Sequence, residues 1–189
     1  MFVALEGADG TGKTTLCDVL AEKLKATPYA TPPKKYMKLR TQIDKDASAD
    51  EHYRFYRDGV YDASQEIDKL LKNNGRVVCD RYWLTTYTYH QVMGVKVSKD
   101  DFQSVIVPTL TIILALDHEV QIDRILRRGA SVGDHRVFYK QKEIATAFLQ
   151  NALEFNIPFV LLDTQRFSPE ACVELIVKAL ECFDIKNYT

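Results

Sequence analysis

The sequence lacks an excess of charge of either sign. It contains 25 Lys and Arg against 26 Asp and Glu, which gives a formal net charge of −1 at pH 7. Proteins that bind nucleic acids usually carry a strong basic excess, so this balance argues against DNA or RNA as the main partner. We therefore expect anion binding to be local, at a site that a few residues build.

Long apolar runs are also missing. No stretch approaches the roughly 20 consecutive apolar residues that a membrane-spanning helix needs. Met1 leads directly into the first predicted strand, with no signal peptide before it. These two features predict a cytoplasmic protein that has no membrane partner.

Cysteines and linkers are sparse. Cys17, Cys79, Cys172 and Cys182 show no Cys-x-x-Cys spacing, and each lies in an apolar segment, which predicts buried free thiols in a reducing compartment. The sequence contains no internal repeat, low-complexity tract or Gly/Ser linker. With 189 residues, 46% of them hydrophobic, the chain is long enough to bury a core, and we expect one domain over residues 1–189.

A phosphate-binding motif stands near the N-terminus. Residues 7–14, GADGTGKT, fill every position of the pattern G-x-x-x-x-G-K-[ST]. Three glycines allow the backbone to point successive N–H groups at phosphate oxygens: Gly7, Gly10 and Gly12. The Lys13 ammonium would reach the β- and γ-phosphates, and the Thr14 hydroxyl would ligate Mg²⁺.

The sequence around this motif has the required context. Residues 2–5 form a short apolar run that is typical of a buried strand. After the motif, apolar residues recur with the spacing of one helix face: Leu16, Val19, Leu20 and Leu24. A Gly-rich turn that precedes Lys-Thr by chance is the alternative, but strand, loop and helix follow in the order that the motif demands. The sequence therefore predicts binding of a nucleoside triphosphate.

Strands and helices alternate along the rest of the chain. Further strands are predicted at residues 29–31, 77–80, 110–116 and 159–162. Helices are predicted at residues 51–72, after Asp80 through Gln91, and at residues 119–128. Two more are predicted from Asp134, as a cap, to Phe155 and from Ser168 onward, and residues 34–45 are predicted to form a loop or a short helix. This alternation predicts an α/β fold in three α-β-α layers, with a five-stranded parallel sheet covered on both faces.

Ligands of such sheets bind at the carboxyl ends of the strands. Asp80 ends a predicted strand and could hold Mg²⁺ directly or through water, although a helix cap is the ordinary alternative. Arg81 follows, and its guanidinium suits a phosphate, although a surface ion pair is the alternative. Next to a phosphate-binding loop, the metal and phosphate roles are favoured.

Arginines also gather around a glycine-bounded break at residues 129–133. Arg124, Arg127 and Arg128 have i, i+3, i+4 spacing and can share one helix face, and Arg136 follows the break. A solvated basic face is the usual explanation, but a short arginine-bearing lid at about residues 127–137 also fits, because phosphoryl transfer is catalysed by neutralising charge. This supply of cations favours a phosphate monoester as acceptor, which needs no base at neutral pH but must be held beside another anion.

At this point the sequence resembles a known family. The segments FVALEGADGTGKTT and CDRYWLTTYTYHQ resemble the thymidylate kinase family of P-loop nucleoside monophosphate kinases, and LALDHEVQIDRILRRG and FVLLDTQRFSPEACVELI extend the likeness through the chain. Within the family, PPKKYMKLRTQID and RFYRDGVYDASQEI look closest to the branch that contains the mitochondrial UMP-CMP kinase. The resemblance implies a homodimer of the P-loop kinase fold. It also implies ATP- and Mg²⁺-dependent phosphorylation of a pyrimidine nucleotide (dTMP, dUMP, dCMP, UMP or CMP) to its diphosphate.

The resemblance also implies a role for individual residues. The catalytic residues would be Lys13, Asp80, Arg81 and Arg128. The ATP contacts would be Gly7, Asp9, Gly10, Thr11, Gly12, Lys13, Thr14, Thr15 and Arg124. The acceptor contacts would be Asp9, Arg40, Tyr56, Arg57, Arg81, Thr85 and Tyr89. The Mg²⁺ ligands would be Thr14 and Asp80.

Some of these positions depart from the family pattern. Tyr56 stands where the family has a Phe that stacks on the pyrimidine, and core packing is its alternative role. Val60 stands where the family has a base-reading Arg, and Arg57 lies one turn earlier. Residues 31–35, TPPKK, replace the Arg-Glu-Pro-Gly-Gly of thymidylate kinases proper, so thymidylate is only one of the possible acceptors, and Arg40 or a lysine would replace the missing arginine.

Three other functions fit the sequence less well. A nucleoside kinase that acts on a sugar hydroxyl usually has Glu-Arg-Ser, where this chain has Asp80-Arg81-Tyr82. A regulatory P-loop NTPase that reads guanine carries Asn-Lys-x-Asp, which does not occur here. A nucleotide-binding remnant without catalysis is disfavoured, because the lysine, threonine, aspartate and arginine of the two motifs are all intact.

Overall fold

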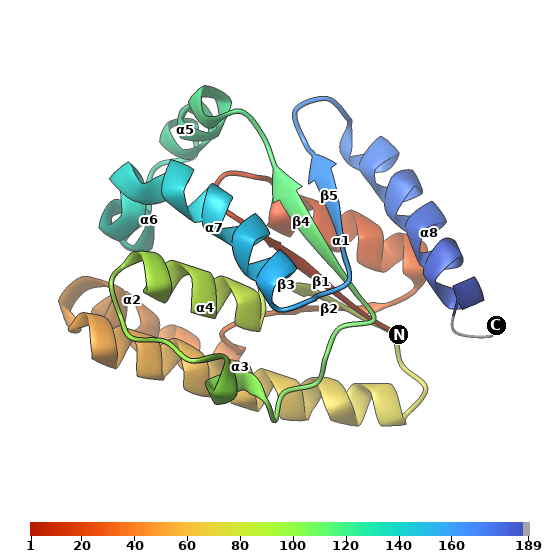
Figure 1. Cartoon of the computed structure of the whole chain (residues 1–189), viewed down its shortest axis with the longest axis horizontal. Helices are drawn as coiled ribbons and strands as arrows, with labels where there is room; N and C mark the ends of the chain where they lie inside the picture. Colours follow the sequence, from red (N-terminus) through yellow and green to blue (C-terminus); the bar gives the residue numbers. More distant parts are fainter. Residues whose placement is uncertain (187–189) are drawn as a thin grey trace.

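A parallel sheet forms the centre of the molecule (Figure 1). The structure is a computed structural model and describes residues 1–186, within which one sheet has five strands in the order β2-β3-β1-β4-β5. The strands are β1 (Phe2–Gly7), β2 (Thr27–Ala30), β3 (Val77–Asp80), β4 (Leu110–Ala115) and β5 (Phe159–Asp163). All four neighbouring pairs run parallel, which confirms the α/β fold and the five-stranded sheet predicted from the sequence.

Helices cover both faces of this sheet. On one face lie α1 (Lys13–Leu24) and α8 (Pro169–Lys186), and on the other lie α3 (Ala49–Lys72), α4 (Trp83–Val92) and α7 (Gln141–Glu154) (Figure 1). Three helices stand beyond the carboxyl ends of the strands: α2 (Met37–Asp46), α5 (His118–Arg127) and α6 (Val132–Val137). Short 3-10 turns are η1 (Lys34–Tyr36), η2 (Lys99–Phe102) and η3 (Phe138–Lys140). Within residues 1–186, no helix combines the length and apolarity that crossing a bilayer would need.

The central strand β1 anchors the phosphate-binding loop. Every residue of β1 is buried, because β3 and β4 pair with it on either side. Its side chains alternate between two cores, as strand geometry requires. Phe2 and Ala4 pack with α3, α4 and α7, whereas Val3 and Leu5 pack with α1 and α8. The loop that follows β1 therefore starts from a fixed position.

Two expectations about local structure were wrong. Asp134 does not open a long helix: α6 begins at Val132 with Ser131 as its N-cap, and a second helix begins at Gln141. The reason is a capping box, in which Ser131 Oγ accepts from the Asp134 N–H at 3.1 Å and Asp134 Oδ2 accepts from the Ser131 N–H at 2.7 Å. The second wrong expectation was the break at residues 129–133: Gly133 is helical, and the break after α5 spans residues 128–131.

The cysteine expectation holds for three residues and fails for one. Cys17, Cys79 and Cys172 are buried free thiols, but Cys182 is exposed. Leu180 is a buried residue of α8, and Cys182 follows it by two positions, which turns it to the opposite side of the helix.

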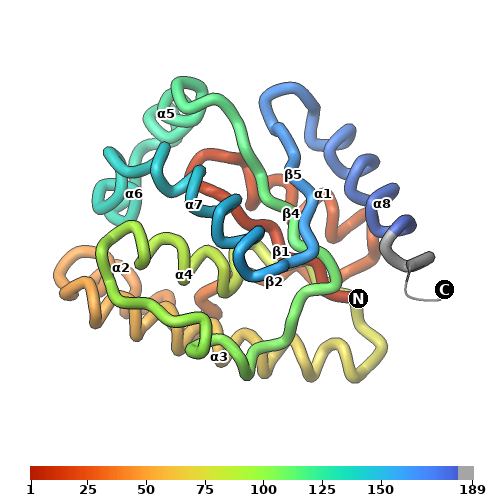
Figure 2. Tube along the Cα trace, in the orientation of Figure 1, coloured from red at the N-terminus to blue at the C-terminus, as the bar shows by residue number. Residues whose placement is uncertain are grey.

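Segments that are far apart in the sequence meet beyond the strand ends. Helix α2 packs against α6, although about 90 residues separate them, and the traced chain shows the two lying side by side (Figure 2). Arg136 of α6 joins them, because its Nε donates to the Asp44 carbonyl at 2.5 Å and its Nη2 donates to the Ala47 carbonyl. These carbonyls belong to the last turn and cap of α2, where a cation is favourable.

Candidate active site

Two cavities flank the phosphate-binding loop of residues 7–14. The first has a volume of about 440 Å³, and its wall includes Asp9 and Thr14 together with residues of α2, α3, α4 and α6. The second has a volume of about 470 Å³ and is lined by Thr11, Gly12 and Thr15 and by the segment between β5 and α8. The loop therefore lies between two cavities, each large enough to hold a small ligand.

Glycines give the loop its shape. Gly10 and Gly12 have φ angles of 77° and 87°, in the left-handed region that favours glycine. A Cβ on Gly7 would lie 2.5 Å from the Leu114 carbonyl oxygen of β4, so no other residue fits there. The loop ends at the first turn of α1, whose free N–H groups favour an anion.

Lys13 is folded back onto the loop that it follows. Its Nζ donates to the Ala8 carbonyl at 2.6 Å and to Thr11 Oγ1 at 3.2 Å, and the residue is only 4% exposed. Burial, together with the nearby positive charge of Arg81, lowers the pKa of Lys13 to about 7. A phosphate near the ammonium would favour its charged form.

Thr14 and Asp80 come together at the joint between the loop and the sheet. The Thr14 hydroxyl donates to Asp80 Oδ2 at 2.5 Å, and Asp80 Oδ1 is buried without a hydrogen-bond partner among the described residues. A hydroxyl oxygen beside an unpartnered carboxylate oxygen is the donor set that Mg²⁺ prefers. Residues 1–186 hold no group of three or more His, Cys, Asp or Glu placed to bind a metal, so phosphates and water would complete the shell.

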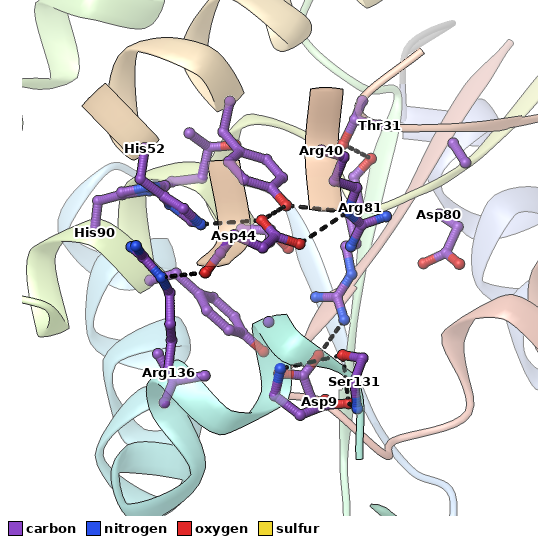
Figure 3. A pocket seen from close by; sticks show the side chains of 18 of the residues that line it. Asp9, Thr31, Arg40, Asp44, His52, Asp80, Arg81, His90, Ser131 and Arg136 are labelled. Carbon is purple, nitrogen blue, oxygen red and sulfur yellow. Dashed lines mark hydrogen bonds and ion pairs between the residues drawn. The ribbon is translucent and has the colours of Figure 1, made fainter. Parts of the chain in front are cut away.

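Asp9 and Arg81 form a buried ion pair that faces the first cavity. Arg81 Nη2 donates to Asp9 Oδ1 (Figure 3). Burial alone would raise the pKa of the Asp9 carboxyl. The charges of Arg81 and Lys13 lower it by more than burial raises it, so this pKa is well below its usual range. Arg81 adopts a φ of 67°, which is unusual for a residue with a side chain and is typical of functional sites. Its guanidinium also lies 5.7 Å from the Tyr89 ring centroid.

Glu6 is a site residue that sequence reasoning missed. It is 1% exposed at the end of β1, and it accepts from the Thr85 N–H at 3.1 Å and from the Thr85 hydroxyl. Burial, only partly offset by these bonds, raises the pKa of Glu6 to about 7. Its signal in the sequence is a charged residue inside an otherwise apolar strand, where it must have a buried partner.

Replacing Glu6 with glutamine is expected to remove a pH dependence of folding. The folded protein binds an extra proton at Glu6 between pH 4.5 and about 7, so the stability that this proton contributes is present below pH 4.5 and lost as the pH rises to 7. As the pH rises from 4.5 to 7.5, the free energy of unfolding of Glu6→Gln should increase by about 3 kcal/mol relative to that of wild type. Urea denaturation across this range measures it, with the exposed Glu143→Gln as control. Parallel pH curves for Glu6→Gln and wild type would contradict the expectation.

A polar cluster closes the far end of the first cavity, and sequence reasoning missed most of it. His52, His90 and Arg136 gather around Asp44, away from Asp80 (Figure 3). The Tyr56 hydroxyl donates to Asp44 Oδ1 at 2.7 Å and accepts from Arg40 Nε at 3.1 Å. Tyr56 is thus both on the apolar stripe of α3 and part of the cavity wall.

The two histidines of this cluster connect α4 to α2. His90 Nδ1 lies 2.6 Å from the Thr86 carbonyl, His90 Nε2 lies 2.8 Å from His52 Nδ1, and His52 Nε2 lies 3.2 Å from Asp44 Oδ1. Burial lowers the pKa of His90 to about 4, so it is neutral at pH 7. Because the carbonyl only accepts, His90 Nδ1 carries its proton and His90 Nε2 accepts from His52.

Comparison with known proteins identifies the family. A family model described as thymidylate kinase matches residues 5–176. The chain belongs to the thymidylate kinase family. It is therefore an enzyme of the nucleoside monophosphate kinase class, as the sequence predicted. The closer likeness to the branch with the mitochondrial UMP-CMP kinase stays a prediction.

Relatives in the thymidylate kinase family match along nearly the whole chain. A probable thymidylate kinase of Archaeoglobus fulgidus is 28% identical over 193 residues, which cover 97% of this chain and 96% of the relative. One of Methanococcus vannielii is 30% identical over 185 residues, 89% of each chain. Among solved structures, thymidylate kinase from Candida albicans matches with a TM-score of 0.77 at 18% identity, covering 96% of this chain and 91% of that chain, which shows a common fold.

This thymidylate kinase family member brings most of the predicted acceptor residues to one place. The first cavity is lined by Asp9, Arg40, Tyr56, Arg81, Thr85 and Tyr89. Arg57 is the exception: its Nη2 pairs with Asp58 at 2.9 Å, and its guanidinium lies beside the rings of Tyr53 and Tyr61. Tyr56 lines the cavity, whereas Arg57, about 100° further around α3, lies against two rings of its own helix. The structure therefore does not bring Arg57 to the cavity where the other predicted acceptor residues meet.

The arginines predicted to share a helix face have separate surroundings. Arg124 lines the second cavity and its Nη2 donates to the Thr164 carbonyl at 3.2 Å. Arg128, which follows the last residue of α5, lines the first cavity and its Nη2 donates to Asp134 at 2.7 Å. Arg127 is exposed and pairs with Asp123 on its own helix. Two of the three thus face different cavities, and the third faces solvent.

Proposed function

We propose that this enzyme transfers the γ-phosphoryl group of ATP, with Mg²⁺, to the phosphate of a pyrimidine nucleoside monophosphate. The observation that supports this most directly is the pair of cavities that meet at the loop of residues 7–14, each with an arginine on its wall: Arg81 in the first and Arg124 in the second. In the reaction, an oxygen of the acceptor phosphate forms a bond to the γ-phosphorus. The bond from that phosphorus to the β–γ bridging oxygen breaks, and ADP leaves with the electron pair.

In this proposal ATP occupies the second cavity and the loop. The phosphates lie against the loop N–H groups and the start of α1, with Thr15 beside them. Lys13 moves from the Ala8 carbonyl to the β- and γ-phosphates. The base and ribose lie between Arg124 and the segment before α8. Thr14 and Asp80 would hold Mg²⁺, which supplies charge neutralisation when it is bound.

The acceptor occupies the first cavity. The Arg81 guanidinium binds its phosphate, and Asp9 and Tyr89 lie toward the sugar. Tyr56 supplies a ring for the base to stack on, and Thr85 lies on the same wall. Arg40 also lines this cavity, beside Tyr56, and we propose it in place of the arginine missing from residues 31–35.

The segment of residues 127–137 acts as the lid in this proposal. Its Arg128 already faces the first cavity and is paired with Asp134 of the same segment. Moving the guanidinium from that carboxylate to the transferred phosphoryl group would neutralise charge in the transition state. Arginine contacts of this kind accelerate phosphoryl transfer by about 10³–10⁵.

The identity of the base is the finer part of the proposal. The relatives named above are described as probable thymidylate kinases, which favours dTMP. The TPPKK segment and the resemblance to the UMP-CMP branch favour a wider set, dUMP, dCMP, UMP and CMP. We also propose that the enzyme forms a homodimer through the long helix α3, which sedimentation velocity would test.

A substrate panel is expected to show ADP release with one or more pyrimidine monophosphates and ATP, and none with free nucleosides. The measurement is coupled ADP release with dTMP, dUMP, dCMP, UMP, CMP, AMP and GMP, alongside thymidine and deoxycytidine. A nucleoside acceptor would require a carboxylate base, whereas in the first cavity Asp9 is ion-paired with Arg81 and Asp80 is the proposed Mg²⁺ ligand. Turnover of the nucleosides alone would replace this proposal with a nucleoside kinase.

A further inference from the structure

Two buried glutamine side chains meet at Asp9. Gln121 belongs to α5 and is 2% exposed, and Gln141 is the first residue of α7 and is fully buried. Gln121 Nε2 donates to the Asp9 carbonyl at 2.7 Å and to Gln141 Oε1 at 2.8 Å. A buried amide costs free energy unless it is hydrogen-bonded, and here each amide finds its partners in the other amide and in Asp9.

Gln141 holds both the backbone and the side chain of Asp9. Its Oε1 accepts from the Asp9 N–H at 3.3 Å, and its Nε2 donates to Asp9 Oδ2 at 3.1 Å. The other carboxylate oxygen, Oδ1, accepts from Arg81. One carboxylate oxygen of Asp9 thus bonds to the Gln141 amide and the other to the Arg81 guanidinium, which fixes the orientation of the carboxylate. The carboxylate in turn orients Arg81.

The two glutamines stand at the two ends of the segment proposed as the lid. Residues 122–140, which include residues 127–137, connect Gln121 to Gln141. The amide–amide bond therefore closes the base of the lid, and both amides attach that base to one residue of the phosphate-binding loop. Gly10 allows α5 to lie this close to the loop, because a Cβ there would be only 3.0 Å from the Gln121 carbonyl oxygen and from Ile125.

We propose that Gln121 and Gln141 are positioning residues that fix the Asp9 carboxylate against Arg81 and fasten the base of the lid to the phosphate-binding loop. The inference rests on the proposed function for the roles of Asp9 and Arg81. Neither glutamine touches the reacting atoms, so each acts through Asp9. A displacement of about 1 Å in a reacting group can cost about 10²-fold in rate, so orientation of Asp9 and Arg81 matters as much as their presence.

Gln141→Glu tests the proposal with nearly the shape of the wild-type side chain. The new carboxylate would stand beside Asp9 in place of a donor, and two adjacent carboxylates raise each other's pKa. Carbon-13 NMR titration of the unliganded protein should show the carboxyl pair at positions 9 and 141 losing its last proton at least one pH unit above the Asp9 carboxyl of wild type. At pH 7.5 the acceptor kcat/KM should fall about 10²-fold, while the KM for ATP stays unchanged.

Asn151→Asp is the matched control. Asn151 is also a buried amide of α7, but it donates to Thr88 and Gln91 on α4 and lies away from the loop. It receives the same amide-to-acid change, so any loss of α7 packing should appear in both variants. We expect its carboxyl titration at Asp9 and its acceptor kcat/KM to match wild type. Equal Asp9 titrations and equal acceptor kcat/KM values for Gln141→Glu and Asn151→Asp would overturn the positioning role.

Gln121→Met keeps the test decisive if Gln141→Glu fails to fold. Methionine fills the same volume but cannot donate to the Asp9 carbonyl, so cleavage of residues 128–137 by protease should speed up at least tenfold without loss of global stability. Unchanged cleavage would overturn the attachment of the lid. Failure of wild type on every monophosphate would overturn the proposed function instead, because the Asp9 titration and the cleavage assay need no substrate.

Discussion

Replacing Lys13 with methionine is expected to abolish phosphoryl transfer and, at the same time, to stabilise the fold. The lost ammonium would no longer stabilise the β- and γ-phosphates, so kcat should fall by at least about 10²-fold. The gain in stability follows from burial, which lowers the pKa of Lys13 to about 7. Between pH 7 and 10.5 the unfolded chain binds a proton that the folded protein does not, so wild-type stability is lost as the pH falls through this range.

Methionine removes that penalty and retains the apolar stem of the side chain. The Ala8 carbonyl keeps a partner, because the Thr11 hydroxyl also donates to it at 2.9 Å. At pH 7 we expect Lys13→Met to unfold at a higher urea concentration than wild type, with the difference shrinking toward pH 10.5. Lys23→Met on the same helix is the control, since Lys23 is exposed and pairs with Glu174 at 2.7 Å. A destabilised Lys13→Met would show that the buried ammonium holds the loop together.

Replacing Arg81 with glycine is expected to lower kcat/KM for the acceptor by about 10³-fold or more. The guanidinium is the cation that we propose for the acceptor phosphate. Hydrogen bonds to charged groups contribute about 1.5–3 kcal/mol each, and a misplaced acceptor costs about a further 10²-fold in rate. Glycine is the sharper choice, because the φ of 67° at residue 81 costs it nothing and any loss of activity cannot come from backbone strain. The measurement is initial velocity against acceptor concentration at saturating ATP.

The same variant should uncover the carboxylate that Arg81 now neutralises. Without the guanidinium, burial would raise the pKa of Asp9, and stability at neutral pH should fall and partly recover in acid. Arg76→Ala is the control, since Arg76 donates to the Leu24 carbonyl at the other end of β3 and lines neither cavity. If kinetics of Arg81→Gly and Arg76→Ala agree, Arg81 has no part in the reaction.

The elements nearest the motif followed from the sequence, whereas those of residues 128–141 did not. The strand at residues 2–5, the helix after the loop and the strand at 110–116 carry continuous or periodic apolar patterns, and β1, α1 and β4 appear where expected. Asp134 carries the chemistry of a cap but acts as the third residue of a capping box. The pattern S-x-x-D was present in residues 131–134, and reading the serine as the cap would have placed α6 correctly.

The candidate site also contains residues that could be predicted from the sequence and residues that could not. Thr14 and Asp80 could be paired in advance, because parallel strands bring their carboxyl ends to one edge, and the contact of 2.5 Å agrees with that argument. Arg57 could not be judged, because a one-residue shift along a helix changes the direction of a side chain and the sequence does not say which direction faces the cavity. Gln121 and Gln141 carried no signal, since amides are common on exposed helix faces.

The sequence by itself determined the class of fold, the loop that takes phosphates and the strand-end residues beside it. These depend on local physics: glycine conformation, apolar periodicity, and the rule that parallel strands end together. Only the tertiary structure decided which side chains form the far wall of the first cavity and which amides hold Asp9. Asp44, His52 and His90 come from three helices, and their contacts depend on how those helices pack, which no pattern within any one of them encodes.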